Sequence, residues 1–332
     1  MNGTLMASEA ASAPQLIAQQ LQKNQSVCAD LGAQIRAFDP TLVYIIGRGS
    51  SDHAGVYAKY LIEVELGIPV CAAAPSVTGL FGRQLNLKRA LVLCISQSGR
   101  SPDILTQAAA ARKSGALCVA LVNDQSSPLA ELADVVVPLL VGEEKAVAAT
   151  KSYLATLSAI LQLVAFWANN PSLQQALTVL PKQLQQAVDA PPQLTQSFVD
   201  PLKHCVVLGR SFGYAISREI ALKLKEVLGI HAESFSSAEF LHGPVTLVAN
   251  KLGVIDIDLE DESAIAHRAQ IAEIAQRGGI MAQLHTVGTE LHPRTAALTV
   301  LQRFYLDIEQ IAVSMGRDPD RPVGLNKVTK TV

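Results

Sequence analysis

Short apolar runs alternate with amphipathic stretches along much of the chain. After residue 40, runs rich in Val, Ile and Leu predict strands at 42–46, 69–73, 90–95, 117–122 and 135–138. Helix candidates lie between them, near 52–66, 76–82, 102–114 and 127–132. The strand runs are continuously apolar, which is typical of parallel strands buried on both faces. This rhythm predicts an α/β fold with a doubly wound parallel sheet.

Helical patterns frame this region. Apolar residues recur at helical spacing through the first forty residues, which predicts an N-terminal helical arm over residues 1–39. The most apolar stretch, 153–168, is short for a membrane span and contains Thr156, Ser158 and Gln162. We therefore expect a buried helix over about 148–168, followed by a further helix and a hinge at Asp189–Pro192.

The second half of the chain repeats the first at an offset of 162 residues. Gly47-Arg48 matches Gly209-Arg210, and the Leu-Gly-Ile at 66–68 matches that at 228–230. The run 91–95 falls on 253–257. Three matches in one register predict two duplicated, doubly wound, flavodoxin-like sheets. The expected division is an arm at 1–39, domains at 40–190 and 191–317, and a tail at 318–332.

Composition limits the partners and the compartment. Apolar residues make up 49% of the chain and charged residues 17%, the net charge is −2, and no basic stretch is present. Nucleic acid and membrane surfaces are therefore not expected as partners. The five cysteines have no CxxC spacing, and the N-terminus lacks a signal-peptide pattern. We expect a cytoplasmic protein without disulfides, metal or cofactor.

A serine-rich loop is the first candidate for chemistry. The sequence from Ser96 to Pro102 reads SQSGRSP and follows a strand that should be central. The hydroxyls of Ser96, Ser98 and Ser101, with free N–H groups at a helix start, can bind a phosphate without a lysine. An ordinary serine-rich turn with a helix cap is the alternative. The aligned loop of the second copy, 258–261, is acidic, so one phosphate site per chain is expected.

Two other motifs are more ambiguous on their own. Gly47–Ser51 forms a second glycine-containing turn between strand and helix, and a tight turn with a cap explains it equally well. Glu226 stands where the first copy has Val64, although a solvated Lys/Glu helix face is the ordinary explanation. His242 follows a short helical segment, where a surface or capping role is expected.

Together these motifs resemble the SIS (sugar isomerase) family, most closely the isomerase half of glucosamine-6-phosphate synthase. The resemblance extends from residue 47 to 332 and rests on motifs at 49–51, 96–101, 147–151, 222–226, 230–234, 239–244 and 318–327. It implies that each of the two duplicated sheets is a SIS domain.

The resemblance implies roles for individual residues. Glu226 would be the base that moves a proton between C1 and C2, with Lys223 nearby. His242 would open the sugar ring and would come from the neighbouring subunit, so a homodimer is expected. Lys327 on the closing tail would form a Schiff base or hold substrate oxygens. The contacts to phosphate and sugar hydroxyls would come from Ser51, Ser96, Gln97, Ser98 and Ser101, beside Gly49, Ser50 and the backbone of Val147.

Departures from the synthase pattern determine which reaction we expect. We expect no glutaminase domain or N-terminal cysteine nucleophile before the first sugar domain, and Arg100 replaces an acidic residue. The loop resembles that of stand-alone SIS deaminases, which implies conversion of glucosamine 6-phosphate and water to fructose 6-phosphate and ammonia. An aldose–ketose isomerase, a ketosamine-phosphate deglycase and a non-catalytic sugar-phosphate sensor remain as alternatives. The choice between a gluco and a galacto sugar also stays open.

Overall fold

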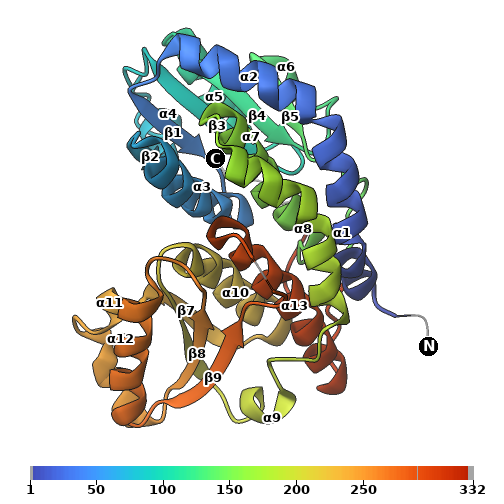
Figure 1. Cartoon of the computed structure of the whole chain (residues 1–332), viewed down its shortest axis with the longest axis vertical. Coiled ribbons are helices and arrows are strands. Elements are labelled where there is room, and N and C mark those ends of the chain that lie inside the picture. Colours follow the sequence, from blue (N-terminus) through green and yellow to red (C-terminus); the bar gives the residue numbers. More distant parts are fainter. Residues whose placement is uncertain (1–2, 290, 328–332) are drawn as a thin grey trace. The chain divides into compact units, whose positions relative to one another are not determined.

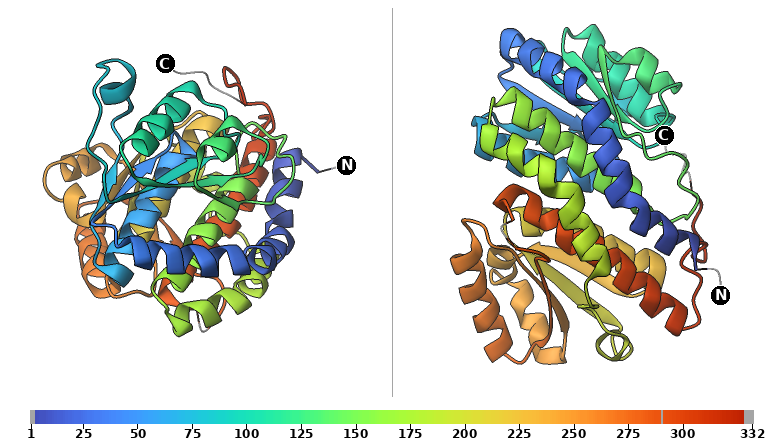
Figure 2. Two further views of the ribbon diagram at one scale, coloured as in Figure 1. Left: turned by 90° about the horizontal axis from the view of Figure 1, so that it is seen from above. Right: turned by 45° about the vertical axis from the view of Figure 1, so that its right-hand side comes forward.

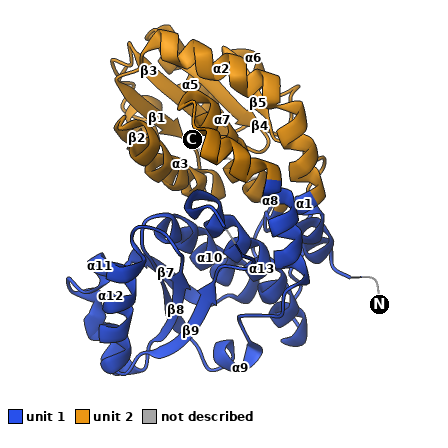
Figure 3. Cartoon of the chain, in the orientation of Figure 1, with its two compact units in different colours: residues 1–14, 145–150, 179–327 blue, residues 15–144, 151–178, 328–332 orange. Residues whose placement is uncertain are grey.

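A computed structural model of the chain describes residues 3–289 and 291–327, which form two compact units (Figure 3). Unit 1 comprises the described residues within 1–14, 145–150 and 179–327, and unit 2 those within 15–144 and 151–178. The units interleave along the chain, whereas the boundaries expected from the sequence divide it into consecutive blocks. Those boundaries stay a prediction.

Unit 2 contains a parallel sheet with the strand order β2-β1-β3-β4-β5 (Figure 1). Its strands are β1 (Leu42–Ile46), β2 (Val70–Ala72), β3 (Ala90–Ser96), β4 (Leu117–Val122) and β5 (Val135–Pro138). The continuous apolar runs form these strands because both faces of the sheet are covered, and β3 and β4 are buried along their whole length. The five strands predicted from the sequence are confirmed.

Helices pack on both faces of this sheet (Figure 2). On one face, α5 (Pro102–Lys113) and α6 (Pro128–Leu132) bury side chains such as Ile104 and Leu129 against Val92 and Cys94. On the other, α3 (Ser50–Leu66) lies so close to β1 that a Cβ at Gly55 would be 2.9 Å from Ile45. The unit also contains α2 (Gln25–Phe38), α4 (Pro75–Gly79) and α7 (Lys151–Trp167).

The apolar stretch at 153–168 belongs to α7, whose side chains are nearly all buried. The prediction of a buried helix is therefore confirmed. None of the described helices combines the length and the apolar character that crossing a lipid bilayer demands. The predicted arm consists of two helices, α1 (Leu5–Lys23) and α2, and α8 (Pro171–Asp189) follows α7.

Unit 1 contains a second parallel sheet with the order β7-β6-β8-β9. Its strands are β6 (His204–Gly209), β7 (His231–Ser236), β8 (Gly253–Asp258) and β9 (Ile280–His285). One face is covered by α10 (Phe212–Leu228) and α13 (Pro293–Ser314). The other is covered by α11 (Ser237–Phe240), the 3₁₀ helix η1 (Pro244–Asn250) and α12 (Ala264–Gln276). The short helix α9 (Gln196–Val199) precedes β6.

The two sheets share one topology and one sequence register. Helix α10 begins and ends 162 residues after α3. Both helices stop at a glycine with positive φ, +67° at Gly67 and +59° at Gly229, a backbone conformation that favours glycine. In both sheets the first strand lies between the second and the third, which is the flavodoxin-like order. The predicted fold class, two duplicated doubly wound sheets, is confirmed.

Candidate active site

The two predicted phosphate-binding loops of unit 2 follow neighbouring strands. Strands β1 and β3 are paired, with Ile46 opposite Cys94, so the loops after them leave the same edge of the sheet. This is the switch point of the topology, where sheets of this kind bind ligands. A hydrogen bond also links the two segments, because Arg48 Nε donates to Asp103 Oδ2 at 2.6 Å.

The serine-rich loop has a fixed internal geometry. Ser96 is only 5% exposed, and its Oγ accepts the N–H of Gly99 at 3.1 Å. Gly99 has a φ of +64°, and a Cβ there would lie 2.2 Å from Ser127 Oγ. The carbonyl of Gly99 accepts the N–H of Leu129 at 3.2 Å. Ser96 therefore shapes the loop, and glycine is required at position 99.

The other polar groups of this loop are more accessible. Gln97, Ser98 and Ser101 are partly exposed, and Ser101 caps α5 without a side-chain capping bond. Helix α5 starts at Pro102, which has no N–H, and in its first turn the N–H groups of Ile104 and Leu105 already have acceptors. The accessible donors here are therefore the side-chain hydroxyls. Uncharged donors at a helix start suit a phosphate group.

Charged side chains beside the loop are already paired. Asp103 lies buried in the first turn of α5, and its ion pair with Arg48 offsets a negative charge that would oppose an anion. Arg100 Nη2 binds Asp124 Oδ2 at 2.7 Å. Hydrogen bonds from Ser126 and then Arg100 lower the pKa of Asp124 to about 2. Arg100, the departure noted in the sequence, therefore forms an ion pair at the rim of the loop.

In the turn after β1, two segments of backbone pack too closely for a side chain between them. Gly49 has a φ of +53°, and its carbonyl accepts the N–H groups of Asp52 and His53. A Cβ at Gly47 would meet the backbone of Ser51 at 2.9 Å. Ser50 and Ser51 begin α3 and are partly exposed. The predicted residues of both loops thus lie at one edge of the unit 2 sheet.

Helix α10 in unit 1 holds a buried lysine between two carboxylates. Lys223 is 1% exposed, and its Nζ lies 2.6 Å from Glu226 Oε2 and 3.1 Å from Glu219 Oε1. Tyr305 donates its hydroxyl to Glu219 Oε1 at 3.4 Å. Burial alone would lower the pKa of Lys223, but the two carboxylates outweigh burial and raise that pKa above its ordinary value.

This arrangement suits Glu226 for proton transfer. Glu219 is fully buried, whereas the side chain of Glu226 is 22% exposed, so a substrate can approach its carboxylate. The buried ammonium group fixes its position. Glu219 was not identified from the sequence, although its i, i+4 spacing to Lys223 on one helix face is a signal that could have found it.

The C-terminal segment brings two further predicted residues together in unit 1. Lys327 Nζ donates to the carbonyl of Ala146 at 2.6 Å, and the N–H of Val147 donates to the carbonyl of Asp320 at 3.0 Å. The carboxylate of Asp320 in turn accepts the N–H groups of Leu5 and Met6, each at 2.8 Å. Lys327 and Val147 therefore belong to one hydrogen-bond network.

His242 follows the short helix α11. Its N–H donates to the carbonyl of Glu239 at 3.0 Å, and the next residue, Gly243, has a φ of +148°. The side chain is exposed, and within residues 3–289 and 291–327 no hydrogen bond of the imidazole is formed. Its predicted donation to a neighbouring subunit concerns a second chain and stays a prediction.

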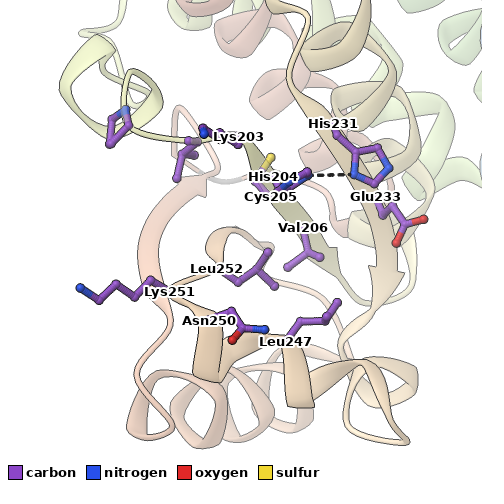
Figure 4. A pocket seen from close by; sticks show the side chains of 12 residues that line it. Lys203, His204, Cys205, Val206, His231, Glu233, Leu247, Asn250, Lys251 and Leu252 are labelled. Carbon is purple, nitrogen blue, oxygen red and sulfur yellow. Dashed lines mark hydrogen bonds between the residues drawn. The ribbon is translucent and has the colours of Figure 1, made fainter.

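A cavity of about 560 Å³ lies elsewhere in unit 1, at the starts of β6 and β7 (Figure 4). His204 and His231 face each other there, with their Nδ1 atoms 3.3 Å apart (Figure 4). None of the predicted site residues lines it, and it occupies the edge opposite the carboxyl ends of the strands. Across the described part of the chain, no cluster of three His, Cys, Asp or Glu side chains could hold a metal ion.

Comparison with known proteins identifies the family. The SIS domain family model matches residues 39–166 and 201–284, more than half of the chain. The chain belongs to the SIS domain family. Its first matched segment contains both loops of unit 2, and its second contains α10 and His242.

Among solved structures, this SIS chain resembles a candidate phosphosugar isomerase from Silicibacter pomeroyi DSS-3, with 36% identity and a TM-score of 0.90. The match covers 96% of this chain and all of that one. A glucosamine-6-phosphate deaminase from Thermotoga maritima shares the fold, with 20% identity and a TM-score of 0.71, over 95% of this chain and 99% of that one.

A curated relative is the isomerizing glutamine–fructose-6-phosphate aminotransferase of Thermus thermophilus. It is 28% identical over 324 residues, which are 90% of this chain and 53% of that protein. The chain thus spans about half the length of the curated relatives it matches.

Proposed function

We propose that this SIS protein is a phosphosugar-converting enzyme, and specifically a glucosamine-6-phosphate deaminase. The observation that carries the proposal is the buried Lys223 ammonium that holds a partly exposed carboxylate, Glu226, in a fixed position. A sugar-phosphate sensor has no need of such a base. The names of the relatives support a phosphosugar substrate.

The serine loop accounts for the phosphate end of the substrate. The hydroxyls of Ser98 and Ser101, which stand at the start of α5, bind the phosphate oxygens. The turn at Gly49–Ser51 contributes further donors. Because these donors are neutral and preorganised, a dianion binds without a lysine. Gripping the phosphate restricts the position of C1 and C2, which is the usual role of substrate binding energy.

The base then acts on the open-chain sugar. His242 assists ring opening, and Glu226 takes the C2 proton and delivers it to C1. The C1 aldehyde carbon gains hydrogen while the C2 amine becomes an imine, so the amino-aldose isomerises without a net redox change. Water adds to the imine carbon, and ammonia leaves to give fructose 6-phosphate. Lys327 holds a substrate oxygen or forms a Schiff base with the ketose.

The test is ammonia release from glucosamine 6-phosphate with no glutamine present. We expect equal amounts of ammonia and fructose 6-phosphate, measured by coupled assays. Galactosamine 6-phosphate in parallel decides which amino sugar is preferred. Folded protein that releases no ammonia from either sugar would refute the deaminase proposal.

An aldose–ketose isomerase is the second candidate, since transfer of a proton between C1 and C2 needs the same base. A tagatose-6-phosphate ketose/aldose isomerase from Escherichia coli shares this fold, with 18% identity and a TM-score of 0.80. Deuterium incorporation into sugar phosphates that lack nitrogen separates the two activities. A deaminase prefers the 2-amino sugar, whereas an isomerase turns over the hydroxy sugar. A ketosamine-phosphate deglycase would act only on N-substituted ketosamines.

A further inference from the structure

A chain of hydrogen-bonded polar side chains, buried at its centre, crosses one face of the unit 1 sheet. His267 on α12 is 2% exposed, and its Nε2 lies 2.7 Å from Asp256 Oδ1 in the middle of β8. Its Nδ1 lies 2.9 Å from Ser237 Oγ at the start of α11. Gln283 on β9 donates to Asp256 Oδ2 at 3.0 Å, and Ser237 Oγ lies 2.6 Å from Gln270 Oε1.

The hydrogen bonds fix the Ser237 hydroxyl from two sides. The Asp256 carboxylate only accepts, so His267 Nε2 carries a proton and donates it. Ser237 Oγ donates to Gln270 Oε1, and Nδ1 of His267 lies within hydrogen-bond distance on its other side. The hydroxyl therefore has a partner on either side.

The three residue types match those of a catalytic triad, but the burial does not. Ser237 is fully buried, so a substrate carbonyl has no access to its Oγ. The serine lies at Nδ1 of the imidazole and the carboxylate lies at Nε2, which is the reverse of the pairing in a catalytic triad. A buried polar network that is fully satisfied rigidifies the elements that it joins.

The element that this network holds is α11, the segment that leads to His242. Helix α11 has four residues, too few to be stable by itself. Phe240 packs into the apolar cluster with Val206 and Val248. At the other end of the helix, the Ser237 side chain is hydrogen-bonded to α12. His242 lies five residues after Ser237, and its imidazole forms no hydrogen bond among the residues that the structure describes.

We propose that the Ser237–His267–Asp256 network is a positioning device for the segment 238–242 and thereby for His242. This inference rests on the ring-opening role given to His242 in the proposed function. Ser237, His267 and Asp256 are positioning residues, because they are buried and act through the backbone of α11.

Hydrogen–deuterium exchange tests the anchoring without reference to any activity. The N–H groups of Leu241 and His242 are bonded to the carbonyls of Ala238 and Glu239, so their exchange reports opening of this turn. In Ser237→Ala we expect exchange of these amides to rise about tenfold, the effect of losing one buried hydrogen bond. The matched control is Thr299→Val, which removes a buried hydroxyl from α13 in the same unit. Unchanged exchange at 241–242 in Ser237→Ala overturns the proposal.

A double-mutant cycle then tests the link to His242. We expect Ser237→Ala to lower kcat about fivefold in the wild-type background and to have less than about a twofold effect in His242→Ala. His267→Gln, which retains a hydrogen-bonding side chain, should lose less activity than His267→Leu. Additive losses in the cycle would show a merely structural network and refute the link. If the wild type turns over no phosphosugar, the proposed function fails, while the exchange experiment still decides the anchoring.

Discussion

Helices α3 and α10 occupy the same place in their respective units, but α10 is charged where α3 is apolar. The two helices share the offset of 162 residues, so their positions can be compared directly. Tyr57 and Leu61 of α3 are fully buried and Val64 is 52% exposed. The corresponding residues of α10 are Glu219, Lys223 and Glu226. Burial at the three positions follows the same pattern, whereas the chemistry differs.

The difference indicates which helix is specialised for chemistry. A buried ion pair is on balance no more stabilising than well-packed apolar side chains of similar volume. Retaining Glu219 and Lys223 in a helix whose counterpart has Tyr57 and Leu61 therefore does not serve stability. The pair instead places a third residue, Glu226, in a defined position with an accessible carboxylate.

The loops at the two switch points also differ, and here the loop that suits an anion is in unit 2. After β3, unit 2 has serines and a glycine, whereas after β8 unit 1 has acidic residues in the segment 258–262. Arg268 pairs with Asp258 and Glu260, and Arg294 with Glu262. The two arginines offset only part of the charge of the four acidic residues in this segment, so the loop does not suit an anion. In the proposed function, unit 2 therefore supplies the anion loop and unit 1 the base.

The largest expected effect is on the base. Glu226→Gln keeps the size and the hydrogen bond to Lys223 but cannot take a proton, so kcat should fall by about 10²- to 10⁴-fold. Its matched control is Val64→Gln at the corresponding position of α3, where we expect unchanged turnover. Steady-state kinetics of both variants make the measurement. Equal activity of Glu226→Gln and the wild type would remove Glu226 from the mechanism.

Breaking the ion pair comes next. Lys223→Leu leaves Glu219 buried without its cation and should lower the free energy of unfolding by about 3–5 kcal/mol. Combining Glu219→Tyr with Lys223→Leu recreates the α3 pair and should recover most of this loss. Urea denaturation followed by circular dichroism measures both. Simple additivity of the two substitutions would mean that the pair is not coupled.

The same lysine predicts the pH dependence. Its pKa is raised in the folded protein, so its contribution to stability is complete below the ordinary value of 10.5 and is lost only as pH rises through the folded pKa. Between pH 6 and 9 we expect the double variant Glu219→Tyr/Lys223→Leu, which leaves no lone buried carboxylate, to differ from the wild type by a constant free energy of unfolding. A difference that changes within this range would contradict the ion pair.

A smaller effect is expected from the backbone of the anion loop. Gly99→Ala must accept a positive φ and a Cβ that overlaps Ser127, so we expect a loss of about 2–4 kcal/mol in unfolding free energy. Gly82→Ala is the matched control, since Gly82 has a φ of +59° with open space around its Cα. It should lose only about 1 kcal/mol, the positive-φ part. Similar losses in the two variants would show that contact with Ser127 is unimportant.

The smallest effect concerns one phosphate contact. Ser98→Ala should raise KM about tenfold with little change in kcat, because a hydrogen bond to a charged group contributes about 1.5–3 kcal/mol. Ser263→Ala removes a serine hydroxyl from the loop after β8 and should leave KM unchanged. Binding of inorganic phosphate, measured by calorimetry, gives a second measurement. Phosphate that binds both variants equally would exclude Ser98 from the site.

The sequence predicted the buried strands of unit 2 and the register of the duplication, because both depend on local apolar runs. It did not locate β7 and β9, which lie at the edges of their sheet and mix polar with apolar residues. Of the site, the serine loop and Glu226 were found by motif. Glu219 and the contacts of Ser237 with α12 were not, since they depend on side chains meeting across the folded core.

The buried pair on α10 also restricts how such a helix can arise by mutation. Starting from an apolar pair such as that of α3, either first substitution to Glu or Lys leaves a lone charge in the core and destabilises the unit by several kcal/mol. The substitutions are tolerated if they pass through an uncharged polar residue such as Gln, or if they occur while a second copy of the unit still folds. A duplicated chain supplies that second copy, so one half could change its helix while the other kept its original packing.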